Sequence, residues 1–73
     1  MSPSQNLADK LVTFFSDFGM LGGATEEELY EVIWKALEYH NKEEIQIIKD
    51  YFRDIKWANS RAQDLYTQID LWY

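Results

Sequence analysis

Apolar side chains recur every three or four residues along most of the chain, which is the spacing of helices that each bury one face. The longest series follows Asn41 and alternates by three and four residues, as the a and d positions of a heptad do. It consists of Ile45, Ile48, Phe52, Ile55, Asn59, Ala62, Tyr66, Ile69 and Tyr73. The adjoining g positions are Tyr51, Ala58, Leu65 and Trp72. A face of this width is typical of a helix in a bundle rather than in a two-stranded coiled coil.

A shorter helix is expected to begin at Ser2 or Ser4 and to end before Gly19. Pro3 fits the first helical position, where its missing N–H costs nothing, and glycine is a common residue just after a helix. The following segment, GMLGGA, holds all the glycines of the chain. We expect it to form a loop that closes the end of the core. The alternative is a hinge that lets the first helix move.

A second helix is expected from Thr25 to about His40. The sequence TEEE predicts a capping box, in which Thr25 and Glu28 satisfy each other's free backbone N–H groups. The polar strip of this helix is narrow, and a helix that is apolar around most of its girth is covered on more than one side. Asn41, with Glu44 three residues later, is expected to cap the next helix.

The segment from Asn41 to Tyr73 contains neither glycine nor proline, so we expect one continuous helix of about 46 Å. The two shorter helices reach about half that length, which leaves the far half of its apolar face uncovered. We therefore expect an all-α bundle that forms a single domain over residues 1–73 and is completed by a homodimer. The predicted dimer interface consists of Ile55, Asn59, Ala62, Tyr66, Ile69, Trp72 and Tyr73.

A break at ANSRAQ is the alternative to the continuous helix, because Ser60 and Gln63 can form a capping box for a fourth, short helix. Asn59 has two interpretations. It is either a buried amide that fixes the register of an oligomer, or a satisfied polar residue at a kink or solvent gap. Trp72 and Tyr73 continue the apolar face, and we expect them to be its last buried turn.

The composition narrows the class of protein. A chain of 73 residues without cysteine has no disulfide or thiolate–metal site to stabilise it, so dense packing or association must contribute. The net charge of −6 argues against binding to nucleic-acid phosphates. No apolar run approaches the roughly 18 residues that span a membrane, and the first residues lack the pattern of a signal peptide. We expect a cytoplasmic protein without a membrane partner.

Candidate catalytic and metal-binding groups are few. His40 is the only histidine, and no cysteine is present to bind a metal or act as a nucleophile. Carboxylate-bridged metal sites in bundles use a Glu-x-x-His step, but the residue three positions before His40 is Leu37. We therefore expect neither an enzyme nor a metal or cofactor. His40 is expected to favour the end of its helix, with a pH-sensitive contact as a further role.

Trp57 falls at an f position, opposite the apolar face of the helix expected over residues 42–73. Arg53 and Arg61 lie four residues away on either side, so both can stack on the indole. Exposed tryptophan and arginine are typical of the residues that dominate binding energies at interfaces. The alternatives are that the shorter helices cover Trp57, or that it stacks on a nucleic-acid base, which the acidic charge disfavours.

Acidic charge is concentrated in residues 24–41, which hold five acidic residues and one lysine. Glu27, Glu31 and Trp34 are therefore candidates, together with Trp57 and its arginines, for a surface that binds a protein with a basic or apolar groove. We expect an adaptor, inhibitor or regulator of another protein, of the kind that phages and mobile elements encode. The alternatives are an acidic nucleic-acid mimic and a structural oligomer subunit.

Overall fold

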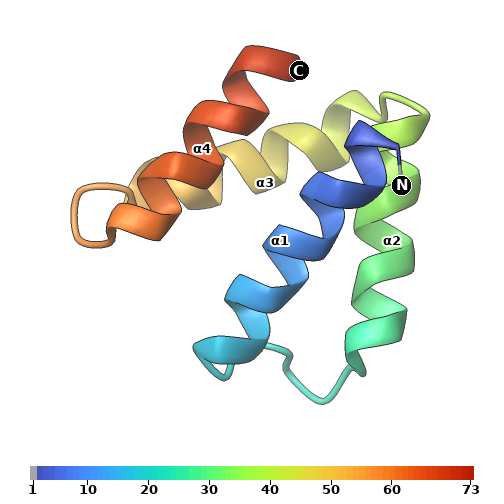
Figure 1. Ribbon diagram of the computed structural model, residues 1–73, viewed down its shortest axis with the longest axis horizontal. Helices are drawn as coiled ribbons and strands as arrows, with labels where there is room; N and C mark the ends of the chain where they lie inside the picture. Colours follow the sequence, from blue (N-terminus) through green and yellow to red (C-terminus); the bar gives the residue numbers. More distant parts are fainter. Residues whose placement is uncertain (1) are drawn as a thin grey trace.

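The computed structural model describes residues 2–73, and the regular structure within this range is entirely helical. Four helices follow one another along these residues: α1 (Pro3–Asp17), α2 (Glu26–Glu38), α3 (Lys42–Ile55) and α4 (Ser60–Trp72). Figure 1 shows α1 between α2 and α4, with α3 behind them. The predicted all-α class is confirmed. The predicted number of helices is wrong, because the expected long C-terminal helix is two helices.

The first helix begins as its sequence predicts. The Ser2 side chain accepts a hydrogen bond from the Gln5 N–H, and the Gln5 side chain accepts one from the Ser2 N–H, which completes a capping box after which Pro3 opens the helix. The chain leaves the helix through Gly19, whose φ of +66° lies in the left-handed region that glycine adopts without strain. This turn lets the Met20 N–H bond the Phe15 carbonyl at 2.8 Å.

The starts of α2 and α3 have the predicted cap residues, but at Thr25 only one of the two hydrogen bonds of the predicted capping box is formed. Thr25 accepts a hydrogen bond from the Glu28 N–H at 3.1 Å, and Asn41 accepts one from the Glu44 N–H at 3.2 Å. His40 stands between these helices with a φ of +53°, a conformation that is uncommon for a residue with a β-carbon. The Asn41 N–H then bonds the Ala36 carbonyl at 2.9 Å and closes the end of α2.

The chain turns between α3 and α4, so the predicted continuous helix is wrong and the alternative break is confirmed. Asn59, rather than Ser60, is the cap: its side-chain oxygen accepts hydrogen bonds from the N–H groups of Arg61 at 2.9 Å and Ala62 at 3.2 Å. Lys56 leaves α3 with ordinary right-handed angles, φ −61° and ψ −26°. No residue of this turn has a positive φ, and therefore the turn needs no glycine.

Folding α4 back places its apolar face on the same core as α3. The molecule measures 28 × 28 × 22 Å, far short of the expected helix. Ala62 and Ile69, two residues of the predicted dimer interface, are fully buried within the single chain and have no surface to offer a second copy. The buried cluster consists of Leu7, Ala8, Leu11, Val12, Phe14, Ile33, Leu37, Ile45, Phe52, Ala62, Leu65 and Ile69.

Aromatic rings join the two halves of this core. The ring centroids of Phe14 in α1 and Phe52 in α3 lie 5.2 Å apart, and those of Phe15 and Tyr51 lie 5.7 Å apart. The Tyr51 hydroxyl also donates a hydrogen bond to the sulfur of Met20 at 3.1 Å, which ties the loop after α1 to α3. Within residues 2–73, no helix has both the length and the mean hydropathy that crossing a membrane requires.

Candidate protein-interaction site

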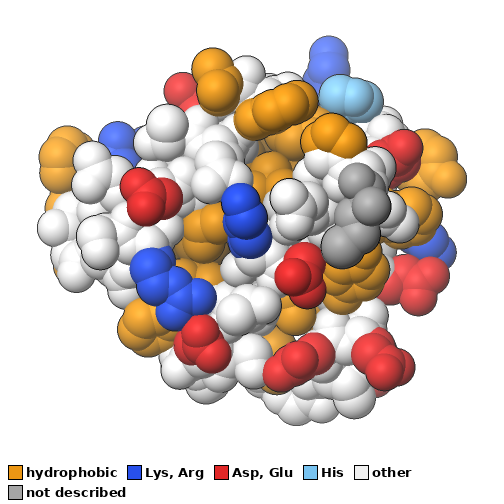
Figure 2. All heavy atoms as spheres, viewed as in Figure 1, with side chains coloured by type: hydrophobic (Ala, Val, Ile, Leu, Met, Phe, Trp, Pro, Cys, Tyr) orange, Lys and Arg blue, Asp and Glu red, His pale blue; other side chains and the backbone are white. Residues whose placement is uncertain are grey.

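A groove runs between α1 and α2 and encloses a cavity of about 390 Å³. The antiparallel packing of the two helices brings together side chains that are far apart in the sequence. We call this feature the acidic groove, and it is lined by Asp9, Val12, Glu26, Glu27, Tyr30 and Glu31. Figure 2 shows acidic side chains on the part of the surface that α1 and α2 form. The sequence-predicted residues Glu27 and Glu31 therefore belong to one surface feature.

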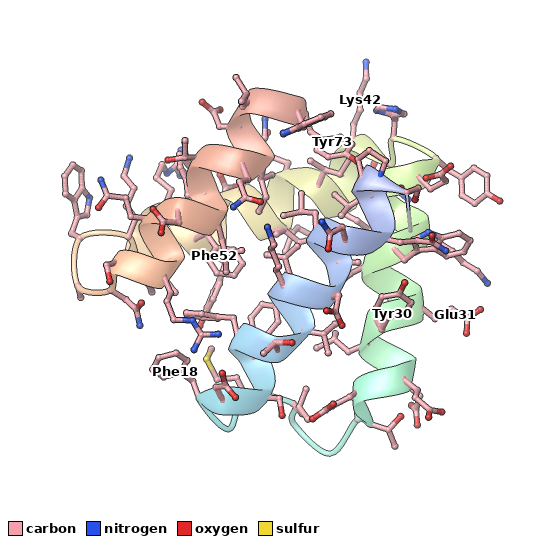
Figure 3. All side chains as sticks on the ribbon, in the orientation of Figure 1. Phe18, Tyr30, Glu31, Lys42, Phe52 and Tyr73 are labelled. Atoms are coloured by element: carbon pink, nitrogen blue, oxygen red, sulfur yellow. The ribbon has the colours of Figure 1, made fainter. Side chains whose placement is uncertain are left out.

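The floor of the acidic groove is apolar. Val12 is buried in the core, and Tyr30 packs against the core while remaining half-exposed. Tyr30 and Glu31 are neighbours on α2, and Figure 3 labels both side chains on this helix. The Ser16 hydroxyl donates a hydrogen bond to Glu26 at 2.6 Å, which joins the end of α1 to the start of α2. The groove thus has an apolar base that packs on the core, below exposed carboxylates.

The charges lining the acidic groove all have one sign. Its four carboxylates belong to Asp9, Glu26, Glu27 and Glu31, and no basic side chain lines it. Lys35 lies outside the lining and pairs with Glu31 at 3.1 Å, but both groups are largely exposed, so water and salt screen this pair. A cationic group that enters the groove therefore meets a negative local field over an apolar floor.

A second groove, between α1 and α4, has a similar volume of about 410 Å³ but a mixed lining. Lys10 and Arg61 contribute positive charge to it, while Asp9 and Asp64 contribute negative charge. Opposite charges so close together largely cancel at a distance, so this groove does not select a partner by the sign of its charge. Its size alone gives no reason to prefer it as a binding site.

Trp34, a sequence-predicted partner-binding residue, lies mainly against the core. It is half-buried, and its indole Nε1 is buried without a hydrogen-bond partner among the described residues. A buried donor left unpaired costs about 1–3 kcal/mol, so the packing of the ring must offset this cost. Trp34 does not line the acidic groove formed by Glu27 and Glu31. The three residues predicted together on α2 thus do not share one site.

Trp57 lies in the turn between α3 and α4 and is 84% exposed, so the shorter helices do not cover it. The predicted stacking of Arg53 and Arg61 on its indole is wrong, because α3 ends before Trp57 and helical spacing no longer applies. Lys56 contacts the indole of Trp57 instead. Its ammonium nitrogen lies 4.8 Å from the centroid of Trp57 and 4.5 Å from that of Tyr66, within the range of cation–π attraction.

The two arginines expected beside Trp57 make other contacts. Arg53 pairs with Asp50 of its own helix at 3.3 Å. Arg61 pairs with Asp17 at 2.9 Å, and its guanidinium carbon lies 5.6 Å from the ring centroid of Phe14. Arg53 therefore remains on α3, whereas Arg61 fastens α4 to α1.

The remaining residues of the predicted dimer interface are divided between the core and the surface. Ile55, Asn59, Tyr66 and Tyr73 are half-buried within the chain, and only Trp72 of the predicted set is mainly exposed. The expected burial of Trp72 is therefore wrong for the single chain, whereas Tyr73 does pack against the core. Dimerisation through these residues stays a prediction.

The ring of Tyr73 lies over His40, with 5.3 Å between the ring centroids, so the last residue packs on the turn after α2. Burial, and secondarily the negative charge of Glu38, raises the pKa of the Tyr73 hydroxyl above its ordinary value.

Among residues 2–73, no group of three or more His, Asp or Glu side chains has an arrangement that could hold a metal ion. Comparisons with protein-family models, curated proteins and solved structures find no match.

Proposed function

We propose that the protein is a non-enzymatic, cytoplasmic interaction module that regulates a partner by holding a basic segment of it in the acidic groove. The observation that carries this proposal is the lining of the groove, in which carboxylates from facing helices surround an apolar floor without any basic side chain. The uneven charge of the sequence supports the same assignment, since residues 24–41 hold five acidic residues and one lysine.

A lysine or arginine side chain matches this lining in both of its parts. Its aliphatic stem can lie on Val12 and Tyr30, while its charged end reaches the carboxylates of Asp9 and Glu31. A fully apolar segment would cover carboxylates such as that of Asp9 without offering them a partner, and an acidic segment would be repelled. The groove is therefore selective for a cationic side chain with an apolar stem.

The exposure of these carboxylates sets the expected strength of binding. An exposed ion pair contributes only about 0.2–1 kcal/mol, so one contact gives little affinity and several must act together with the apolar floor. The interaction should weaken as ionic strength rises, since salt screens exposed charges over about 10 Å at 0.1 M. Such moderate affinity suits a regulator that must release its partner.

Binding of a short labelled peptide of lysine and leucine, followed by fluorescence anisotropy, tests the proposal. The double variant Asp9→Asn, Glu31→Gln removes one carboxylate from each wall of the groove without changing the first turn of either helix. Its matched control is Asp54→Asn, Asp64→Asn, which makes the same change in net charge at two exposed residues outside the groove. The groove variant should bind about two- to tenfold more weakly than the control variant.

Equal weakening in both double variants would contradict the proposal. Binding would then follow the total charge of the protein and not the position of its carboxylates, which is the behaviour of an acidic nucleic-acid mimic. A peptide with glutamate in place of lysine provides the second control, and it should not bind to the unmodified protein. Binding of that acidic peptide with similar affinity would also refute a charge-selective groove.

A further inference from the structure

A third groove, formed by α2, the turn after it and the first turn of α3, has a partly apolar lining and shares no lining residue with the acidic groove. It encloses a cavity of about 310 Å³. Tyr39 at its edge is 73% exposed and Val32 is 57% exposed, which are large values for side chains of this kind. We call this feature the α2–α3 groove, and it is lined by Val32, Lys35, Ala36, Tyr39, Asn41 and Glu44.

The most exposed large apolar side chain of the described residues is Trp57, at the other end of α3. The ammonium group of Lys56 contacts both this indole and the ring of Tyr66. Exposed tryptophan is the residue type that most often dominates the energy of an interface.

We propose that the α2–α3 groove receives Trp57 of a second copy of this chain. Val32, Ala36 and Tyr39 offer the indole an apolar contact. Lys35 of the lining is paired with Glu31, which leaves a glutamate as the unpaired charge beside the groove. Glu43 and Glu44 lie at or next to the groove and form no ion pair within residues 2–73. Lys56, next to Trp57, also has no carboxylate partner within that range. Association pairs Lys56 of each copy with a glutamate of the other.

The position of both features on α3 determines how two copies would meet. The groove adjoins the first turn of α3, and Trp57 follows its last turn, so the 14 residues of this helix separate them by about 20 Å. The turn that carries Trp57 lies at the opposite side of the molecule from α2 (Figure 1). Trp57 therefore cannot fill the groove of its own chain. Two copies with antiparallel α3 helices make both contacts at once, in the two-fold symmetry that most homodimers adopt.

Ile47 supports this arrangement. It lies on α3 between the groove and Trp57, and it is 68% exposed. Most of its side chain is therefore open to water within the single chain, and a second antiparallel α3 would cover it. The contact area remains small, so the dimer should dissociate on dilution.

Sedimentation equilibrium over a dilution series tests the inference. The mass should rise from 8.7 kDa at low concentration towards twice this value at high concentration. Trp57→Ala should raise the dimer dissociation constant by at least about tenfold, as truncation of a dominant interface residue does. Trp72→Ala is the matched control, since it also removes an exposed tryptophan but lies outside both features, and it should leave the dissociation constant unchanged. Circular dichroism should show the same helix content in both variants, because neither side chain belongs to the core.

A charge exchange distinguishes the proposed contact from any other route to a dimer. Lys56→Glu should weaken the dimer, and adding Glu44→Lys should recover part of the loss, because the ion pair is then rebuilt with its signs reversed while the contact of Lys56 with Trp57 stays absent. A monomer at all concentrations would overturn the inference. A dimer that is unaffected by Trp57→Ala, or a double variant that associates no more strongly than Lys56→Glu alone, would overturn it as well.

Discussion

Arg61 at the start of α4 donates a hydrogen bond of 2.9 Å to Asp17 at the end of α1, and this ion pair joins residues 44 positions apart in the sequence. Both side chains are about half exposed. We expect a double-mutant cycle with Arg61→Ala and Asp17→Asn to give a coupling free energy of about 0.2–1 kcal/mol in urea unfolding. Arg61→Lys keeps the charge but loses the planar contact with the ring of Phe14, so it should restore only part of the stability. Zero coupling would show that the pair does not hold α4 to α1.

Asn59 should contribute to stability as the cap of α4. Its side chain accepts hydrogen bonds from two backbone N–H groups that otherwise have no partner in the helix. Asn59→Ala should therefore lower the free energy of unfolding by about 1 kcal/mol. Asn59→Asp keeps the acceptor and should stay close to the unmodified protein. If the two variants were equally destabilised, the contribution of Asn59 would not come from capping.

Ile69 and Ile47 provide a comparison of the same residue type inside and outside the core. Ile69 is 0% exposed and Ile47 is 68% exposed. Ile69→Val should destabilise the chain by about 0.5–1.5 kcal/mol, because it removes one buried methylene from a packed core. Ile47→Val should have almost no effect on urea unfolding at concentrations where the chain is monomeric. Equal effects of the two substitutions would contradict the position of α4 on the core.

Tyr73 should make stability depend on pH in the alkaline range. Its pKa is raised above the ordinary value of 10.0 by burial and by Glu38, so the folded chain holds the hydroxyl proton more tightly than the unfolded chain does. The contribution of Tyr73 is fully present below pH 10.0, and it is lost as the pH rises through the folded-state pKa. The melting temperature should fall with alkaline pH less steeply in Tyr73→Phe than in the unmodified protein. Identical slopes would show that the Tyr73 hydroxyl is equally exposed in both states.

The buried face of the C-terminal half was predictable from the sequence, but its path was not. All nine positions of the heptad series, from Ile45 to Tyr73, are buried or half-buried in the structure. The spacing of apolar residues reports which side of a helix faces a core. It does not report whether the axis continues in one direction. The series therefore continues through the turn that reverses the chain.

The residues of the turn between α3 and α4 indicate only weakly that the chain reverses there. Gly19 adopts the left-handed conformation that marks helix ends, but His40 shows that such a position can lack glycine. The turn before Asn59 needs no left-handed residue at all, so neither glycine nor proline marks it. Only the possible capping box of Ser60 and Gln63 pointed to a break, and in the structure Asn59 is the cap. The decisive contribution is tertiary, since the apolar residues of α4 become buried only when the chain folds back.

The candidate site was predictable in part. The clustering of acidic residues pointed to Glu27 and Glu31, and both line the acidic groove. Asp9 was missed, because only the antiparallel packing of α1 on α2 brings it to the same groove. The arginine contacts of Trp57 were predicted wrongly for a related reason. Spacing by four residues places side chains together only where the helix continues, and α3 ends at Ile55.

Each helix of the chain packs chiefly against the helix next to it in the sequence, α1 with α2 and α3 with α4. Most native contacts therefore close short loops, and the entropy lost before the first stabilising contacts form is small. Proteins dominated by such local contacts fold in microseconds to milliseconds. The α1–α2 hairpin and the α3–α4 hairpin can each form before they pack together. This arrangement lets the chain reach its native state quickly, with little time spent in aggregation-prone intermediates that expose apolar side chains.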